Sequence, residues 1–465
     1  MLPGDLSGQS EAAVQYPGVF WILPFVLLLL GIAVFPLLRG THHWWEKNTS
    51  KLMIAGGLGL VTLAHYYLRG YGIEFEGHLT TPGWLTVRDL LVHSVLGEYI
   101  PFISLLFSLY VIAGGICVRG DLPAGPRTNV GLLAVGGLLA SFIGTTGASM
   151  LLIRPLLRAN AGRRRVAHTV VFFIFIVSNV GGLLLPIGDP PLFLGYLRGV
   201  PFLWTLNLWR EWAFTFALLL AIYWIWDVRA FRIDTPHSPP GPLQPVLNIS
   251  VAGKINFLLL ASVVLATGTL DPSKDFLGTG WRPFLFCREL VQIALAALSL
   301  WLTPRLLREE NRFNYAAILE VACLFIGIFI CMQVPIEILN VEGPGLNIKS
   351  PARFFWACGS LSSLLDNAPT YVVFLETAKT LVNQPGTAIL ELTGGGNVHV
   401  DHLAAISLGA VFMGANTYIG NGPNFMVKSI AEHAGVKMPS FFGYMVYSIC
   451  VLLPIFVVVT FLFIG

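Results

Sequence analysis

The sequence predicts an all-α polytopic membrane protein with about 11 transmembrane helices and two re-entrant helical hairpins, in an inverted-topology repeat with two broken helices. Hydrophobic residues make up 55% of the 465 positions, whereas charged residues make up only 11%. A soluble globular chain carries about 25% charged residues. Apolar runs of about 18 or more residues, long enough to cross a bilayer as a helix, recur along the chain. Two further apolar segments are interrupted by glycine, proline and polar residues.

The basic residues orient the spans, because short cytoplasmic loops of membrane proteins are rich in Lys and Arg. The first apolar run, 19–38, follows two acidic residues and no basic one, which is atypical of a secretory signal peptide. The next loop is basic, the loop at 70–97 is mainly acidic, and the third is basic again. We therefore expect the N-terminus and the second loop outside, and the first and third loops in the cytoplasm. The residues behind this assignment are Arg39, Lys47 and Lys51; Glu74, Glu76, Asp89 and Glu98; and Arg119 and Arg127.

These signals divide the chain into four regions. An N-terminal peripheral helix occupies 1–50, and the first repeat follows at 51–227. A polar, Pro-rich segment at 228–254 is the expected cytoplasmic linker, and the second repeat takes up 255–465. Within the repeats we expect ordinary spans near 206–226, 255–270, 284–303, 314–334 and 440–463.

The first hairpin is predicted at 128–158, where basic residues flank an apolar segment at both ends. A single straight span would place one basic cluster on each side of the membrane, against the positive-inside rule. Two arms of about 18–20 Å that enter from the cytoplasm and return would satisfy the rule. We place the tip at 144–147, where the hydroxyls of Thr145 and Thr146 can satisfy backbone groups that lipid could not.

The second hairpin is predicted at 351–380, with the polar sequence SSLLDN in its middle. Each hairpin precedes an apolar segment that is itself interrupted. The segment at 167–199 contains SNVGGLLLPIGDPPLF, and the segment at 402–433 contains IGNGPNF. Glycine permits backbone conformations that other residues avoid, and proline prevents a helix from re-forming, so both segments are predicted to be discontinuous helices.

The two interruptions resemble each other. When 187–193 is aligned with 419–425, four of the seven residues are identical and Asp189 stands opposite Asn421. We expect the two interrupted segments to cross the membrane in opposite directions. Inverted-repeat transporters are organised in this way, with discontinuous helices near the midplane. A broken helix exposes free carbonyls that suit a cation and free amides that suit an anion. We therefore predict a binding site at the breaks rather than a simple kink.

Together the sequences SNVGGLLLPIGDPP, SSLLDNAPT and GANTYIGNGPN resemble the ion-transporter superfamily of arsenite permeases, sodium/proton antiporters, and citrate and dicarboxylate carriers. The resemblance covers nearly the whole chain and is closest to the antiporters and citrate transporters. It implies a homodimer whose protomers each have a scaffold and an elevator-like transport part, with sodium and substrate at the hairpin tips and helix breaks. In place of the Ser-Asn-Thr signature of dicarboxylate carriers, the tips read Thr-Thr-Gly at 145–147 and Asp-Asn-Ala at 366–368. The aspartate of the second tip resembles the antiporter branch.

Two acids are the leading candidates for ion binding. Asp189 lies in the first break and Asp366 in the second hairpin tip, and ionisable residues at membrane depth are functional candidates by default. Neither motif offers an evident basic partner, so we predict a Na⁺ or proton site, with helix capping as the alternative. Neutral oxygens, which hard cations prefer, accompany both acids. The other predicted binding residues are Thr145, Thr146, Ser149, Asn179, Gly188, Ser362, Ser363, Asn367, Asn416, Thr417, Asn421 and Asn424.

Two further charged residues lie inside apolar segments. Glu320 is a candidate proton relay, although its place near the start of a span also fits the cytoplasmic end. Arg154, in the first hairpin, is expected to extend its guanidinium to the cytoplasmic surface, with anion binding as the alternative. The six cysteines and ten histidines show no metal-binding spacing, and no Walker motif occurs, so we expect no cofactor and no ATPase activity.

We predict an ion-coupled secondary active transporter, not an enzyme, that exchanges Na⁺ for H⁺ by alternating access. The first alternative keeps the fold and carries citrate or another organic anion with Na⁺ or H⁺. An arsenite permease is disfavoured because no paired thiols are present, an enzyme because no nucleophile–base motif is visible, and a channel because oppositely directed hairpins suit alternating access better. The expected partners are small ions or a small organic anion, the lipid bilayer and a second copy of the chain, without nucleic acid. The expected location is a bacterial inner membrane.

Overall fold

The computed structural model describes residues 15–36, 38, 40–75, 78–120, 122–234, 250–346, 348–382, 388–393 and 395–465. Helices account for most of this part of the chain, and its strands form three short pairs. Seven of the described helical runs are long and apolar enough to cross a membrane, and three shorter apolar helices accompany them. The chain is therefore an all-α integral membrane protein. A total of 11 spans stays a prediction.

The helices of the first half end with α10, the last helix before the linker. They are η1 (Val19–Ile22), α1 (Leu23–Val34), α2 (His42–Trp45), α3 (Asn48–Leu68), α4 (Trp84–Leu91), η2 (Val92–Tyr99), α5 (Ile100–Ala113), α6 (Pro126–Ile143), α7 (Thr145–Ala159), α8 (Ala167–Ile176), η3 (Val180–Leu184), α9 (Pro190–Leu197), η4 (Trp204–Leu208) and α10 (Trp209–Asp234).

The helices of the second half begin directly after the linker. They are α11 (Ile255–Thr269), η5 (Phe276–Gly278), α12 (Cys287–Leu302), α13 (Arg305–Glu310), α14 (Ala316–Cys331), α15 (Gln333–Glu342), η6 (Gly343–Leu346), α16 (Pro351–Leu364), α17 (Asn367–Lys379), α18 (Val400–Met413), η7 (Gly414–Asn416), α19 (Gly422–His433), α20 (Phe441–Tyr447), η8 (Ser448–Leu452), α21 (Leu453–Val459) and η9 (Thr460–Ile464).

The three strand pairs are all antiparallel. β1 (Glu74–Phe75) pairs with β2 (His78–Leu79), β3 (Cys117–Arg119) with β4 (Ser250–Ala252), and β5 (Ile389–Glu391) with β6 (Asn397–His399). The β3–β4 pair fastens the end of the linker to the segment that precedes α6. The link between the two halves of the chain is thus anchored at one end.

Two boundaries drawn from the sequence are wrong. The loop predicted at 70–97 ends at Trp84, where a helical run begins that continues through α4, η2 and α5. Thr86, Val87 and Leu90 are buried there on one helical face, which stabilises a helix that includes Asp89, one of the acidic residues that marked the loop. The linker predicted at 228–254 is also shorter, because α10 continues beyond 228 and ends at Asp234. Residues 235–249 lie outside the described part.

Each predicted hairpin corresponds to a pair of packed helices joined by a very short turn. Gly144 alone separates α6 from α7, and its φ of 77° is a conformation that favours glycine. Leu365 and Asp366 separate α16 from α17. Each pair precedes a discontinuous helix: α8, η3 and α9 after the first pair, and α18, η7 and α19 after the second. Whether the pairs are re-entrant in a bilayer stays a prediction.

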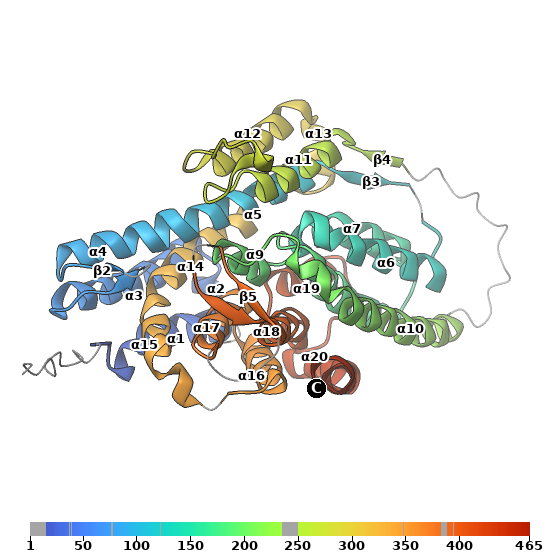
Figure 1. The fold of residues 1–465 in the computed structure, drawn as a ribbon. Helices are drawn as coiled ribbons and strands as arrows, with labels where there is room; N and C mark the ends of the chain where they lie inside the picture. The colour runs from blue at the N-terminus through green and yellow to red at the C-terminus, as the bar shows by residue number, and fades with distance from the viewer. Residues whose placement is uncertain are drawn as a thin grey trace, which may run out of the picture.

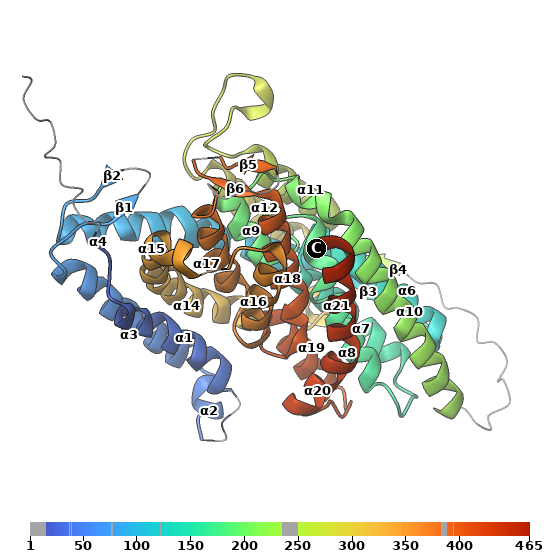
Figure 2. The ribbon, with the colours of Figure 1, turned by 60° about the horizontal axis from the view of Figure 1, so that its bottom comes forward.

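The two discontinuous helices and the helix pairs lie between two outer layers. Figure 2 shows α1 and α3 along one side of the molecule, α10 along the other, and α16 to α19 between them. Within the central group α16 packs against α18, α17 against α9, and α19 against α7. α8 is buried almost throughout, from His168 to Ile176, so it lies in the protein interior.

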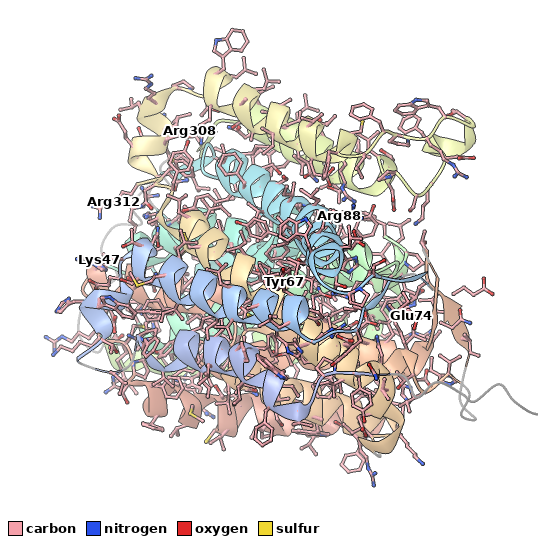
Figure 3. The ribbon with its side chains drawn as sticks, turned by 90° about the vertical axis from the view of Figure 1, so that its left-hand side faces the viewer. Lys47, Tyr67, Glu74, Arg88, Arg308 and Arg312 are labelled. Atoms are coloured by element: carbon pink, nitrogen blue, oxygen red, sulfur yellow. The ribbon has the colours of Figure 1, made fainter. Side chains whose placement is uncertain are left out.

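The labelled charged residues of Figure 3 lie towards two ends of the molecule. Lys47, from a loop predicted to be cytoplasmic, lies towards one end, together with Arg308 and Arg312. Glu74 and Arg88, from the loop predicted to be outside, lie towards the opposite end. We refer to these as the predicted cytoplasmic end and the predicted outer end.

Candidate functional site

Four helices begin around one carboxylate in the middle of the molecule. α7 begins at Thr145, α17 begins at Asn367, and α9 and α19 begin directly after Asp189 and Asn421. Figure 1 shows these helices gathered around the centre of the fold. The Asp189 side chain receives one hydrogen bond from each of the other three residues. We refer to these four residues as the Asp189 crossing.

The hydrogen bonds of the Asp189 crossing join both helix pairs and both breaks. Thr145 Oγ1 donates to Asp189 Oδ1 at 3.0 Å, and Asn421 Nδ2 donates to the same oxygen at 2.9 Å. Asn367 Nδ2 donates to Asp189 Oδ2 at 2.7 Å. Asp189 is only 1% exposed, so these donors replace the water that would otherwise solvate its charge. Asn367 Oδ1 is also buried and has no hydrogen-bond donor among the described residues.

Asp189 and Asn421 occupy equivalent positions in the two breaks. Asp189 has φ −141° and ψ 141°, and Asn421 has φ −153° and ψ 139°; each is the N-cap of the helix that follows. Each of these helices has a proline in its first turn. The internal similarity found in the sequence therefore corresponds to the same local backbone, with a charge in one copy only.

Replacing Gly188 by Ala is expected to abolish transport and to destabilise the protein by about 1–3 kcal/mol, the usual cost of overpacking. A Cβ atom at this position would lie 2.2 Å from the carbonyl oxygen of Gly182. The amide of Thr145 donates to the carbonyl of Gly188 at 2.8 Å, so a shift of the break would move the helix start away from Asp189. Gly422→Ala is the matched control, because a Cβ atom there meets nothing within 4 Å. Transport and Tm of both variants test this; equal behaviour would contradict the packing.

A chain of buried amides connects the Asp189 crossing to the rest of the breaks. Asn421 Nδ2 also donates to Asn179 Oδ1 at 3.2 Å and to the carbonyl of Ser178 at 3.1 Å. Asn179 Nδ2 in turn donates to Asn424 Oδ1 at 2.8 Å. Asn424 Nδ2 donates to the carbonyls of Gly414 and Thr417. Asn179 and Asn424 therefore hold the two breaks together rather than touching Asp189.

The polar residues near the second tip bind mainly backbone groups. Ser362 Oγ donates to the carbonyl of Ala410 at 2.7 Å, and Thr417 Oγ1 donates to the carbonyl of Ser363 at 2.5 Å. Asn416 Nδ2 donates to Ser363 Oγ at 2.9 Å, which leaves Asn416 Oδ1 buried without a donor in the described part of the chain. Ser362 thus satisfies a carbonyl in the last turn of α18, and Thr417 a carbonyl in the last turn of α16.

Asp366, Thr146 and Ser149 make none of the hydrogen bonds of the Asp189 crossing. Asp366 is half-buried and its Oδ1 accepts the amide of Ala368 at 3.0 Å, which is the helix-capping alternative of the prediction. The hydroxyl oxygens of Ser149 and Ser178 are 2.9 Å apart. Thr146 makes no side-chain hydrogen bond to any described residue. Ion binding at Asp366 and Thr146 stays a prediction.

Glu320 lies in an ion pair away from the Asp189 crossing. Its carboxylate is 2.8 Å from Lys51 Nζ, and the Glu320 side chain is 47% exposed. Lys51 belongs to α3, near the predicted cytoplasmic end, so the position fits the second of the two interpretations of Glu320. A relay role for Glu320 stays a prediction that no contact with the crossing supports.

A cavity of about 1640 Å³ opens at the predicted cytoplasmic end. α7, α8, α10, α19 and the segment after α13 line it, and the composition of the lining is strongly basic. Glu310 is the one acid in the described lining, and hydrogen bonds from Arg119 lower the pKa of Glu310. Apart from Arg154, none of these bases was predicted as a site residue from the sequence. The basic lining residues are Arg154, Arg158, Arg163, Arg164, Arg165, Arg229, Arg312, Lys437, His168 and His433.

A buried ion-pair network joins segments that are predicted to lie towards the outer end. Arg198, at the end of α9, lies 2.5 Å from Glu98 in η2 and 2.8 Å from Glu376 in α17. Lys379 contacts Glu376 at 3.0 Å. Side chains of Arg198, Glu98 and Glu376 are each at most 10% exposed. The network therefore connects the central helices to the long helical run that starts at Trp84.

Comparison with known proteins gives one family match. Residues 14–464 match the model of a family described as "Putative citrate transport". No curated protein matches the chain. The match covers both helix pairs, both breaks and the lining of the basic cavity.

Proposed function

The chain belongs to this citrate-transport family, and from that premise we propose that it carries a small polycarboxylate anion such as citrate together with Na⁺ or H⁺. The observation that supports the proposal best is the Asp189 crossing, where helix ends offer groups of both signs. Free amides at helix starts favour an anion, whereas a buried carboxylate and side-chain oxygens favour a cation. A cation and an anion bound at adjacent places would neutralise each other, which is the physical basis of coupled transport.

In this proposal Asp189 is the main ligand of the coupling cation. Its carboxylate is buried and receives donors only from neutral side chains, so a proton or Na⁺ would be the first full positive charge to reach it. Asn367 Oδ1 supplies a second oxygen that lacks a donor in the described part of the chain. Asp366, as the cap of α17, is proposed as a further ligand.

The transport part would consist of α6 to α9 and α16 to α19. These helices meet at the Asp189 crossing and along the buried amide chain, so they can move only as one body. The cavity opens at the predicted cytoplasmic end, while the network around Arg198 joins segments that are predicted to lie towards the opposite end. We propose that this is the inward-facing state of an elevator-type cycle, in which the network breaks when the transport part moves.

Replacing Glu98 by Gln is expected to favour the outward-facing state, because it removes the charge that holds Arg198 to η2. Arg198 keeps Glu376, so the variant leaves no buried guanidinium unpaired. Labelling of a Thr146→Cys reporter by a membrane-impermeant maleimide from the outer face should become at least about 10-fold faster, corresponding to about 1.4 kcal/mol. Glu74→Gln is the control, an exposed acid at the same end. Unchanged labelling in Glu98→Gln would contradict the role of the network.

Transport of radiolabelled citrate into proteoliposomes of the purified protein tests the proposed function. An inward Na⁺ gradient or an inward proton gradient should each be imposed separately, with valinomycin and K⁺ to clamp the membrane potential. We expect citrate uptake under at least one gradient and competition by unlabelled citrate. Absence of uptake under both gradients, with protein that retains its thermal unfolding transition, would overturn the proposal.

Na⁺/H⁺ exchange is the second candidate function. The observation that favours it is that no Lys or Arg side chain contacts Asp189 in the described part of the chain. A carboxylate of this kind can take up a proton or Na⁺ in competition, without any anion. Proton movement recorded by an internal pH dye after a Na⁺ pulse, with no citrate present, would support exchange over citrate transport.

A further inference from the structure

Three arginines from two segments of the chain line the basic cavity and interact electrostatically around Arg154. Arg154 and Arg158 lie on α7, and Arg312 follows α13; all three line the cavity. Arg158 and Arg312 are close enough to Arg154 to repel its charge. Arg158 donates to the carbonyl of Val118 at 2.7 Å, but none of the three forms an ion pair among the described residues.

Arg154 is the most constrained of the three. It is half-buried, and its Nη1 atom is fully buried with no hydrogen-bond partner in the described part of the chain. A buried donor without a partner is unfavourable, and more so when it belongs to a charged group. The Arg154 side chain lines the cavity at the predicted cytoplasmic end, which has room for a ligand. Its extension to the cytoplasmic surface stays a prediction.

Among the neighbouring acids, Glu310 is close enough to attract Arg158, but no carboxylate forms an ion pair with Arg154, Arg158 or Arg312 in the described part of the chain. Glu310 is bound by Arg119 through two hydrogen bonds of 2.7 and 2.9 Å. Asp227 is fully buried and binds Arg163 at 2.6 Å rather than any of the three arginines. A cluster of like charges with low-dielectric walls concentrates counter-ions and is stable when an anion occupies it. The observations therefore call for a ligand with several negative charges.

We propose that Arg154, Arg158 and Arg312 bind a polycarboxylate anion at the predicted cytoplasmic end, as a holding site separate from the Asp189 crossing. The inference rests on the proposed function for the identity of the anion. Guanidinium groups bind carboxylates through two parallel hydrogen bonds, and three of them match a tricarboxylate better than a monovalent anion. Arg154 is nine residues from Thr145 on α7, about 13 Å along a helix, so one anion cannot occupy both places.

The decisive experiment measures the KM for citrate separately at each face of the membrane, in oriented proteoliposomes of neutral phosphatidylcholine. Arg154→Gln should raise the KM at the cytoplasmic face at least 10-fold and leave the KM at the outer face within 2-fold of wild type. Arg154→Lys should fall between the two, since it keeps the charge but loses the paired hydrogen bonds. Arg127→Gln is the matched control: it removes an arginine at the same predicted end that does not line the cavity. An unchanged KM in Arg154→Gln would overturn the holding site.

Two further arms separate the possible occupants and the two proposals. A phospholipid headgroup is also an anion with several hydrogen-bond acceptors, so the measurement is repeated with phosphatidylglycerol added to the vesicles. If Arg154→Gln leaves the citrate KM unchanged but abolishes a dependence on phosphatidylglycerol, the occupant is lipid and the inference is wrong. If the wild type transports no citrate, citrate binding to the purified protein, measured by calorimetry, still tests the holding site. Binding that weakens at least 10-fold in Arg154→Gln supports the site, and absence of binding overturns it.

Discussion

Replacing Asp189 by Asn is expected to reduce cation-driven citrate uptake by at least about 100-fold, equivalent to a loss of about 3 kcal/mol. The carboxylate accepts hydrogen bonds from Thr145, Asn367 and Asn421, and a hydrogen bond to a charged group contributes about 1.5–3 kcal/mol. An asparagine keeps the size of the side chain but removes the charge and turns one acceptor into a donor facing other donors. The initial rate of uptake under each gradient measures the effect.

Two controls separate loss of the cation site from loss of the fold. Asp89→Asn makes the same chemical change at an acid on α4 that pairs with its neighbour Arg88, and uptake should stay within 2-fold of wild type. The double variant Asp189→Asn with Asn421→Asp moves the carboxylate to the equivalent position of the other break. Because both positions have the same backbone, we expect this swap to recover at least a tenth of the wild-type rate. Wild-type uptake by Asp189→Asn alone would contradict the assignment.

Replacing Asp227 by Ala is expected to destabilise the protein by about 3–5 kcal/mol, the usual cost of leaving one partner of a buried ion pair alone. Asp227 is fully buried and accepts from Arg163 at 2.6 Å and from Asn129 at 2.9 Å, with His168 at the same distance. These contacts fasten α10 to both ends of the α6–α7 pair and to the start of α8. Loss of the carboxylate leaves Arg163, whose side chain is 3% exposed, with Asp234 at 3.7 Å as its remaining acid and with a hydrogen bond to Asn160.

The same pair of residue types on the surface provides the control. Asp275 lies 2.8 Å from Arg282, with side chains 44% and 70% exposed. Exposed pairs contribute about 0–1 kcal/mol, so Asp275→Ala should change stability by no more than that. Thermal unfolding in detergent, followed by tryptophan fluorescence, compares the two variants. Equal shifts in Tm would show that burial does not strengthen the Asp227 network.

The fold could be predicted from the sequence to the extent that local patterns determine it. Gly144 and the pair Leu365–Asp366 separate packed helices, as the polar tips of two apolar segments indicated. The start of α4 at Trp84 was not predicted. The acidic residues of 70–97 indicated a loop, whereas the buried face at Thr86, Val87 and Leu90 belongs to a helix. Helix ends on a charged surface depend on packing partners that the local sequence does not reveal.

The site could be predicted in its elements but not in its partners. The alignment of the two breaks paired Asp189 with Asn421, and these side chains lie 2.9 Å apart. Glu98 and Lys51 were counted only as loop charges, yet they bind Arg198 and Glu320. These partners are 100 or more residues away in sequence, and which side chains meet depends on how each helix is rotated in the packed structure. Charge counting gives the side of the membrane, not the pairing.

The accumulation ratio of radiolabelled citrate at steady state tests the central proposal, that the Asp189 carboxylate couples a cation to the anion. Under an imposed Na⁺ or proton gradient, wild-type proteoliposomes should concentrate citrate above the level outside under at least one of the two conditions. Asp189→Asn proteoliposomes should reach no more than the outside concentration under either. Concentrative uptake by Asp189→Asn equal to that of the wild type would show that the coupling cation binds elsewhere and would contradict the account.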